Sequence, residues 1–171
     1  MRPHLFELRA HARYSADTLA VVNKREKRPG HAAWGAFLMA HAAAVRRIEQ
    51  ELQDQRCLPL TWYDVLLELN ATPQRRLRMQ DLSDRVVLSR SRVSRVVDAM
   101  AEQGLVSRQP DPSDKRASFT VLSDSGRRAL RQSAPVYLRG IEEHFTRHLT
   151  AEEIRLVRQA MDKVRAANEE R

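Results

Sequence analysis

Hydrophobic residues recur three and four positions apart along most of the chain, which is the spacing of an amphipathic helix. The longest such pattern covers residues 31–55, where Trp34, Phe37 and Leu38 begin an apolar stripe and charges occur only in the second half. A looser stripe precedes Pro29-Gly30 and ends in basic residues, so it predicts a further helix there. The same spacing predicts helices over 61–70, 79–86, 89–103, 124–148 and 151–171.

The segment from Gly104 to Val121 departs from helical spacing. Gly104 is a typical residue for ending a helix, and Leu105-Val106 begins a strand-like pattern. The run 110–113 contains two prolines and is expected to break that strand, and 119–121 forms a second one. These strands predict a hairpin with a loop too long for a tight turn. We expect its tip to carry Asp114, Lys115 and Arg116.

The order helix, turn, helix and hairpin predicts a winged helix-turn-helix. The second helix of the motif has an apolar face at Val93, Val96, Val97 and Met100 that is suited to a core. The predicted fold class is therefore mostly α with a small β-hairpin wing (α+β).

Helix boundaries are predicted from capping residues, whose side-chain oxygens accept from the first N–H groups of a helix. The candidates are Thr61 with Asp64, Ser89, Ser123 and Thr150 with Glu153. Pro135 lies inside the predicted helix 124–148, where a proline suggests a kink or a break.

These elements divide the chain into four parts. Residues 1–30 form an N-terminal extension, 31–58 a dimerisation helix, 59–123 the winged helix-turn-helix lobe, and 124–171 the C-terminal dimerisation helices. One small lobe cannot cover the apolar faces of the helices at both ends of the chain, whereas pairing with a second copy would bury them. We therefore expect a homodimer.

Charge changes this interpretation by pointing to a partner. The 171 residues include 30 basic and 22 acidic ones, for a net charge of +8, and 42% are hydrophobic. This composition suits one folded domain with an anionic partner such as nucleic acid. Charge alone does not choose among DNA, RNA and an anionic membrane surface.

Several other classes of protein are disfavoured by the composition. Cys57 is the single cysteine, so no internal disulfide forms, and residues 1–20 lack the apolar segment of a signal peptide. Apolar runs are too short to cross a bilayer, so we expect a cytoplasmic protein without a membrane partner. With five glycines and no nucleophile–base set, neither an enzyme nor a cofactor is predicted. His144 and His148 are one turn apart but lack further ligands, so we predict no metal site.

The residues predicted to contact DNA lie on the second helix of the motif, on the hairpin and in the basic segment before the first helix. Arginine can bond guanine through two nitrogens, and serine is a small donor and acceptor. Arg116 could enter a minor groove, with Asp114 orienting its guanidinium. Arg75 and Arg78 are either phosphate anchors or part of a solvated basic loop. The full set is Ser89, Arg90, Ser91, Ser94, Arg95, Asp114, Lys115, Arg116, Arg75 and Arg78.

These motifs resemble those of the MarR family of transcriptional regulators. The resemblance covers about residues 31–165 and rests on Leu60–Leu66, Leu82-Ser83, Ser89–Arg95, Gly104–Val106 and the wing pattern Asp114–Ala117 leading to Leu122–Gly126. It implies a dimeric winged-helix repressor or activator with dimer helices from both termini. By position, Ser89–Arg95 are similar to the family's major-groove residues and Arg116 to its minor-groove arginine. The chain departs from the common pattern in residues 1–30, a preceding segment that many members lack.

The resemblance also implies a ligand crevice between the dimer region and the DNA lobe. Apolar walls with few polar groups suit an aromatic or anionic molecule, although aromatic residues at helical spacing are more often part of a core. The candidate residues are Trp34, Phe37, His41, Trp62, Tyr63 and Asp64.

The sequence therefore predicts a sequence-specific transcriptional regulator that binds a pseudo-palindromic operator as a homodimer. Repression released by a small-molecule effector is what the family resemblance implies. The alternative is an architectural or weakly specific DNA-binding protein without effector control, which would bind duplex through phosphates alone. A winged-helix module used only for protein pairing is disfavoured by the basic recognition face.

Overall fold

The computed structural model describes residues 29–86 and 88–169, and the chain divides into two units, Met1–Ala43 and Ala44–Arg171. The helix predicted within residues 1–28 lies outside the described residues. The helices are α3 (Pro29–Asp54), α4 (Leu60–Asn70), α5 (Met79–Arg85), α6 (Arg90–Glu102), α7 (Asp124–His144) and α8 (Ala151–Glu169), with a 3-10 turn η1 (Thr146–His148). The strands are β1 (Arg76–Arg78), β2 (Val106–Asp111) and β3 (Asp114–Leu122). Of the helices described, none is long and apolar enough to cross a membrane.

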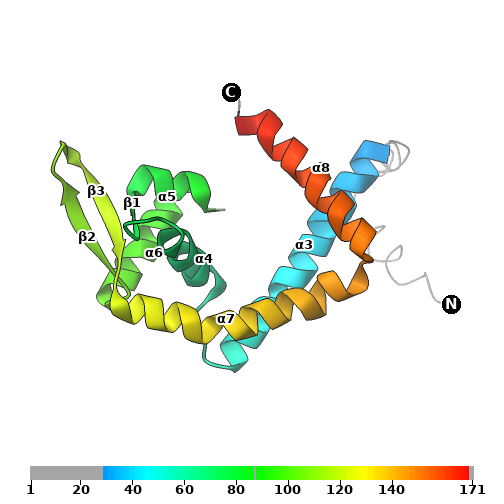
Figure 1. Cartoon of the computed structure of the whole chain (residues 1–171), viewed down its shortest axis with the longest axis horizontal. Coiled ribbons are helices and arrows are strands. Elements are labelled where there is room, and N and C mark those ends of the chain that lie inside the picture. The colour runs from blue at the N-terminus through cyan, green and yellow to red at the C-terminus, as the bar shows by residue number, and fades with distance from the viewer. Residues whose placement is uncertain (1–28, 87, 170–171) are drawn as a thin grey trace, which may run out of the picture. The chain divides into compact units, whose positions relative to one another are not determined.

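The strands form one antiparallel sheet in the order β1-β3-β2 (Figure 1). The predicted wing is the β2–β3 hairpin, which packs beside α5 and α6. The sequence did not predict β1, whose residues Arg76 and Arg78 pair with Val121 and Phe119 of β3. Between them Leu77 is buried, so β1 closes one edge of the core. This mostly helical chain with a small sheet confirms the predicted fold class.

The predicted long loop at the wing tip is wrong. Strand β2 continues through Pro110 to Asp111, and only Pro112 and Ser113 connect it to β3. Proline is tolerated at position 110 because β2 is an edge strand, where one missing N–H breaks no ladder on the open side. The turn is closed by Asp111, whose Oδ1 accepts from the Ser113 N–H at 2.8 Å.

The hydrophobic core of the lobe lies between α4, α5, α6, the sheet and the start of α7. As predicted, α6 buries Val93, Val97 and Met100 completely, and Val96 packs beside them. A second, smaller cluster of Ile48, Leu52 and Val136 joins the end of α3 to α7. The other buried members of the main core are Tyr63, Val65, Leu66, Leu69, Leu77, Leu82, Val86, Val106, Leu122 and Leu130.

The junction between the wing and α7 is close-packed around a glycine. The Ser123 side chain caps α7 by accepting from the Gly126 N–H at 2.9 Å, as predicted. A Cβ atom added to Gly126 would lie 2.1 Å from the carbonyl oxygen of Leu105. That contact is far inside van der Waals distance, so only glycine lets α7 begin here.

The other predicted caps differ in outcome. Thr150 and Glu153 form the reciprocal capping box, with the Thr150 N–H donating to Glu153 Oε2 at 2.8 Å. The Thr61–Asp64 cap is wrong, because the N-cap of α4 is Pro59, two residues before Thr61. Ser89 occupies the N-cap position of α6, but its side chain accepts from no helix N–H. Helix α7 continues through Pro135 without a break, but it ends at His144, so the predicted extension to residue 148 is wrong.

Helix α8 leaves its apolar stripe exposed in the single chain. Ile154, Val157, Met161 and Val164 recur on one face and are each more than a third exposed. Water-exposed apolar stripes of this kind are uncommon unless a partner covers them.

Replacing Gly126 with alanine should destabilise the protein strongly, because the methyl group collides with backbone rather than with a movable side chain. We expect the free energy of unfolding to fall by about 2 kcal/mol or more in urea denaturation. Gly35→Ala is the matched control, because Gly35 is also helical and has open space around its Cβ position. It should leave stability unchanged or raise it by up to about 1 kcal/mol. Equal effects of the two substitutions would contradict the close packing.

Candidate nucleic-acid interface

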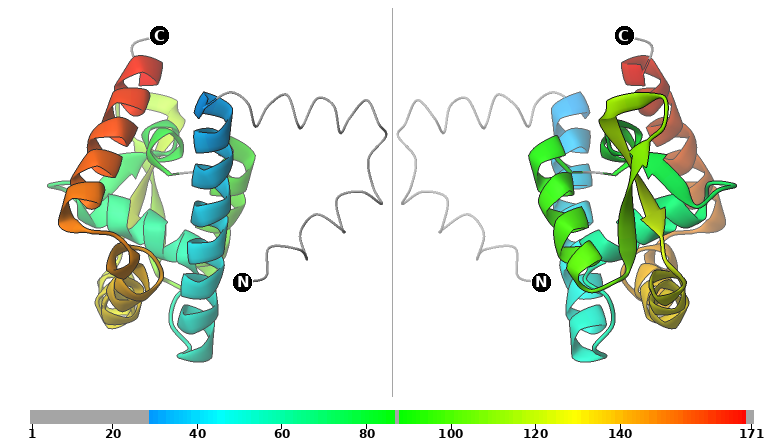
Figure 2. Two further views of the ribbon diagram at one scale, coloured as in Figure 1. Left: turned by 90° about the vertical axis from the view of Figure 1, so that its right-hand side faces the viewer. Right: turned by 90° about the vertical axis from the view of Figure 1, so that its left-hand side faces the viewer.

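Helix α6 presents a polar face on the opposite side from its core residues. Ser91 and Arg95 are exposed there, Ser94 is half-buried, and the exposed Ser89 precedes them. Arg95 Nε donates to the Ser91 carbonyl at 3.4 Å, a long bond that costs little to break. Figure 2 shows α6 alongside the β2–β3 hairpin. The polar face of the helix thus lies beside the hairpin.

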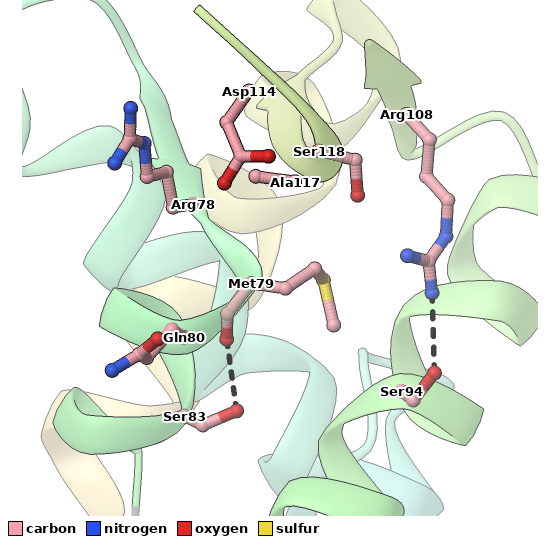
Figure 3. Close-up of a pocket in the computed structure, with 9 residues that line it drawn as sticks. All are labelled: Arg78, Met79, Gln80, Ser83, Ser94, Arg108, Asp114, Ala117 and Ser118. Carbon is pink, nitrogen blue, oxygen red and sulfur yellow. Dashed lines mark hydrogen bonds between the residues drawn. The ribbon is translucent and has the colours of Figure 1, made fainter. Parts of the chain in front are cut away.

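An ion pair joins the hairpin to α6. Arg108 of β2 donates from Nη2 to Asp98 Oδ1 at 2.7 Å and to Ser94 Oγ at 3.3 Å. Figure 3 shows the hydrogen bond from Arg108 of β2 to Ser94 of α6. Arg108 was not among the predicted site residues. Its position two residues after the buried Val106 gave the available signal, because alternate strand residues share a face.

A surface pocket of about 490 Å³ lies between the start of α5, α6 and the wing (Figure 3). Arg78 and Arg108 come from its opposite sides, and hydroxyl and amide groups lie between them. Hydroxyl and amide groups of this kind bind phosphate oxygens of nucleic acids. The lining residues are Arg78, Met79, Gln80, Ser83, Ser94, Arg108, Asp114, Ala117 and Ser118.

The edge of the sheet holds its arginines by internal contacts. The Arg76 guanidinium lies 4.5 Å from the centroid of the Phe119 ring, within cation–π range. Arg78 Nη2 lies 2.6 Å from Asp111 Oδ2 and donates to Ser113 Oγ at 3.2 Å. Hydrogen bonds from Ser113, helped by the charge of Arg78, hold the pKa of Asp111 below its usual value. Asp111 therefore stays ionised at neutral pH.

The structure brings together part of the predicted DNA-binding set. Ser89, Ser91, Ser94 and Arg95 share the exposed side of α6, and Asp114 and Arg78 line the same pocket as Ser94. Arg75 lies in the turn before β1 with a left-handed backbone (φ 50°), and its carbonyl accepts from the Leu122 N–H. The side chains of three further members, Arg90, Lys115 and Arg116, lie outside the described residues.

Three of the predicted ligand residues lie on α3, in the first unit. Trp34 is 60% exposed, and its ring centroid is 5.8 Å from that of Phe37. Phe37 in turn stacks on the exposed His41, with centroids 6.2 Å apart. These aromatic residues are a surface stripe of the single chain, and they are not part of a core.

The other three predicted ligand residues lie on α4, in the second unit. Tyr63 is buried in the core, with its ring 4.4 Å from that of Tyr137. Trp62 is half-buried against the same core. Burial raises the pKa of Asp64 from its ordinary 3.8 to about 6, and the nearby carboxylates of Glu68 and Glu49 add to the effect.

The two histidines on the C-terminal side do not share a site. His144 Nε2 lies 2.5 Å from Glu51 Oε1 of α3, whereas His148 Nε2 lies 3.0 Å from the Glu143 carbonyl. Within residues 29–86 and 88–169, no group of three His, Cys, Asp or Glu residues is arranged to hold a metal ion.

Comparisons with known proteins agree with this architecture. The model of the MarR family matches residues 58–117. The crystal structure of Sco3205, a MarR family transcriptional regulator from Streptomyces coelicolor in complex with DNA, is 30% identical and has a TM-score of 0.73. That similarity covers 79% of this chain and 85% of Sco3205.

Two further relatives give the same result. AbsC, another MarR family transcriptional regulator from Streptomyces coelicolor, is 27% identical with a TM-score of 0.74, over 82% of this chain and 94% of AbsC. The uncharacterised HTH-type transcriptional regulator YkoM of Bacillus subtilis is 29% identical over 69 residues. That match covers 40% of this chain and 45% of YkoM, so the chain spans less than half the length of this curated relative.

The raised pKa of Asp64 predicts a pH-dependent stability. Between pH 3.8 and about 6 the unfolded chain releases this proton while the folded chain keeps it, so the free energy of unfolding falls as pH rises. Asp64→Asn should remove that loss. At pH 8 we expect the variant to be more stable in urea by about 1 kcal/mol, because solvent at this half-buried side chain screens part of the effect. The difference should vanish below about pH 3, where the Asp64 carboxyl is protonated in both the folded and the unfolded state of the unaltered protein. A difference that is independent of pH would contradict the assignment.

Proposed function

Since the chain belongs to the MarR family of transcriptional regulators, we propose that it binds double-stranded DNA at a pseudo-palindromic operator as a homodimer and represses transcription. The observation that carries the proposal is the exposed face of α6, with Ser91, Ser94 and Arg95, lying beside the wing. A helix that buries one face and exposes short hydroxyls and a guanidinium on the other suits a major groove. No catalytic role is part of the proposal.

The proposed contacts divide by groove. Ser89, Ser91, Ser94 and Arg95 of α6, with Arg90 at its first position, would meet base edges and flanking phosphates in the major groove. Arg116 of the wing would enter the adjacent minor groove, with Asp114 orienting its guanidinium. Lys115 would contact the phosphate backbone of the DNA. Arg75, in the turn before β1, would contact phosphate. The pocket between α5, α6 and the wing supports this arrangement because the hydroxyl and amide groups of Ser94, Ser118 and Gln80 that line it can meet a phosphate oxygen.

The proposed homodimer is supported by the exposed apolar faces at both ends of the described chain. On α8 these are Ile154, Val157, Met161 and Val164, and on α3 they are Trp34, Phe37, Leu38 and Met39. Covering such faces with a second copy removes apolar surface from water. A two-fold dimer also presents two copies of α6 to the half-sites of an inverted repeat, one helical turn apart.

Release by a small effector is the remaining part of the proposal. On α3, the stacked rings of Trp34, Phe37 and His41 offer a surface to an aromatic molecule. On α4, Trp62 and Asp64 combine an aromatic wall with a carboxyl group, while Tyr63 contributes from within the core. Since burial, with the added charges of Glu68 and Glu49, already disfavours a negative charge at Asp64, a neutral aromatic ligand fits α4 better than an anion.

A second candidate function, architectural DNA binding without sequence preference, is favoured by the net charge of +8. Fluorescence anisotropy across a salt series separates the two, with the intergenic DNA beside the protein's own gene and a scrambled duplex as the probes. We expect a preference of about 10³-fold or more for the intergenic DNA. Equal, steeply salt-dependent affinities would overturn the proposal in favour of the architectural function.

In the same assay, Arg95→Ala should weaken operator binding by about 1–3 kcal/mol and random-DNA binding by less, because a base contact carries sequence information and a phosphate contact does not. Arg131→Ala on the exposed side of α7 is the charge-matched control and should lower both affinities slightly and equally. An equal loss on both duplexes for Arg95→Ala would make Arg95 a phosphate anchor.

The dimer is tested by placing a charge on either face of α8. Val157→Glu adds a carboxylate to the apolar stripe, and Gln159→Glu adds one to the opposite face of the same helix. In sedimentation velocity at micromolar concentration, Val157→Glu should shift the protein toward monomer, because burying an unpaired carboxylate is costly. Gln159→Glu should sediment as the unaltered protein does. A dimer that survives Val157→Glu unchanged would exclude this stripe from the interface.

A further inference from the structure

A buried carboxylate ties the wing tip to the strand on the far side of the sheet. The Asp111 side chain is only 3% exposed, and it ends β2 at the point where the chain turns. Its Oδ1 accepts from both the N–H and the hydroxyl of Ser113, at 2.8 and 2.7 Å. Its Oδ2 pairs with Arg78 of β1 at 2.6 Å. One side chain therefore joins β1, β2 and the turn.

Next to this tie, the strand pairing is interrupted. Pro110 pairs with Ser118, whereas the next residue, Asp111, pairs with Asp114. The intervening segment 115–117 of β3 thus faces no partner on β2 and forms a bulge. The bulge includes Lys115, the residue proposed to contact the phosphate backbone of DNA, and Arg116, the residue proposed to enter the minor groove. The bulge is bounded on one side by the Asp111–Asp114 pair and on the other by Pro110–Ser118.

We propose that Arg78 and Asp111 are positioning residues for the wing: their ion pair fixes the turn and hence the bulge that carries Arg116, and Arg78 does not bind phosphate. The inference rests on the proposed DNA-binding function and replaces the sequence-based expectation that Arg78 is a phosphate anchor.

If Arg78 turned toward a phosphate, Asp111 would lose its charged partner. A guanidinium that turned to a phosphate would abandon an ionised, buried carboxylate, and an unpaired buried charge is among the costliest groups in a protein. Two further contacts hold Arg78. Its guanidinium lies 5.8 Å from the centroid of the Phe119 ring and donates to Ser113 Oγ. Arg76, by contrast, is held by its contact with the Phe119 ring. Of the two arginines of β1, Arg78 is therefore the one that is paired with the turn at the wing tip.

A charge effect and a positioning effect predict opposite changes in DNA affinity for Asp111→Asn. If only charge matters, Asp111→Asn removes a negative charge near the DNA and tightens binding. If the carboxylate positions the wing, the same change loosens the turn and weakens binding to the operator. Arg78→Gln should then reproduce Asp111→Asn, and the double variant should be no worse than either single one, because both remove the same tie.

The experiment uses the full-length protein carrying Arg78→Gln, Asp111→Asn, both changes, or Arg78→Lys. Glu142→Gln and Arg131→Gln on the exposed side of α7 are the charge-matched controls. Circular dichroism and thermal denaturation establish that each variant is folded. Hydrogen–deuterium exchange of peptides covering residues 108–118, without DNA, reports the tip directly. Anisotropy on operator and scrambled duplexes across a salt series, with hydroxyl-radical footprinting, reports its use.

We expect exchange at the tip to rise by about tenfold in each single variant and no further in the double one, with exchange in α6 unchanged. Operator affinity should fall by about tenfold or more at an unchanged salt slope. Footprint protection should be lost in the outer minor grooves and kept in the major grooves. Arg78→Lys, which keeps the ion pair, should restore most of the affinity.

Unchanged exchange at the tip, or operator binding by Asp111→Asn as tight as that of the unaltered protein, would overturn the inference. A loss for Arg78→Gln that is equal on both duplexes, with a salt slope smaller by about one, would instead make Arg78 a phosphate anchor. If the unaltered protein shows no operator preference, the proposed function fails, and the exchange data alone then decide whether Arg78 and Asp111 hold the tip.

Discussion

The contact between the Gly126 Cα and the Leu105 carbonyl is the constraint on which the arrangement of the lobe depends. It lets α7 start directly against the end of α6 and the beginning of β2, and the Ser123 cap fixes the direction in which α7 leaves. From there α7 contributes Leu130 to the core of the lobe and Val136 to the cluster at the end of α3. A single backbone approach therefore sets how the DNA-binding elements are joined to the helix that leads away from them.

Arginine has two different uses in this lobe. Arg108 and Arg78 are paired with Asp98 and Asp111, and Arg76 lies on Phe119, so these three side chains hold the hairpin to its neighbours. Arg95 makes one long bond to the Ser91 carbonyl of its own helix among the described residues, a bond that a partner could readily replace. A basic composition thus overstates the number of DNA contacts, because part of the positive charge is already neutralised inside the fold.

How much the sequence revealed depended on the range of the interactions involved. The spacing of Val93, Val97 and Met100 was sufficient for α6, because periodicity records directly which face is buried. Three-residue β1 is too short to show alternation, and its pairing with β3 is a contact between distant segments. Pro110 led to the wrong prediction of a strand break, because a strand tolerates proline at this position only when it lies at the edge of the sheet, as β2 does. Similarly, Thr61 and Thr150 begin comparable capping patterns, but Pro59 starts α4 before Thr61 can act. The role of Arg108 and the pairing of Asp111 with Arg78 were missed because these partners are set by tertiary packing.

The exposed stripe on α8 has a consequence for how such a regulator would respond to its own abundance. In the proposed homodimer, the species that engages both half-sites forms in proportion to the square of the monomer concentration while monomers predominate. Operator occupancy would then rise more steeply than the protein concentration. When growth dilutes the protein, a dimeric regulator would leave its operator sooner than a monomeric one. Four aliphatic and thioether side chains on one helix would thereby set a concentration threshold for gene control.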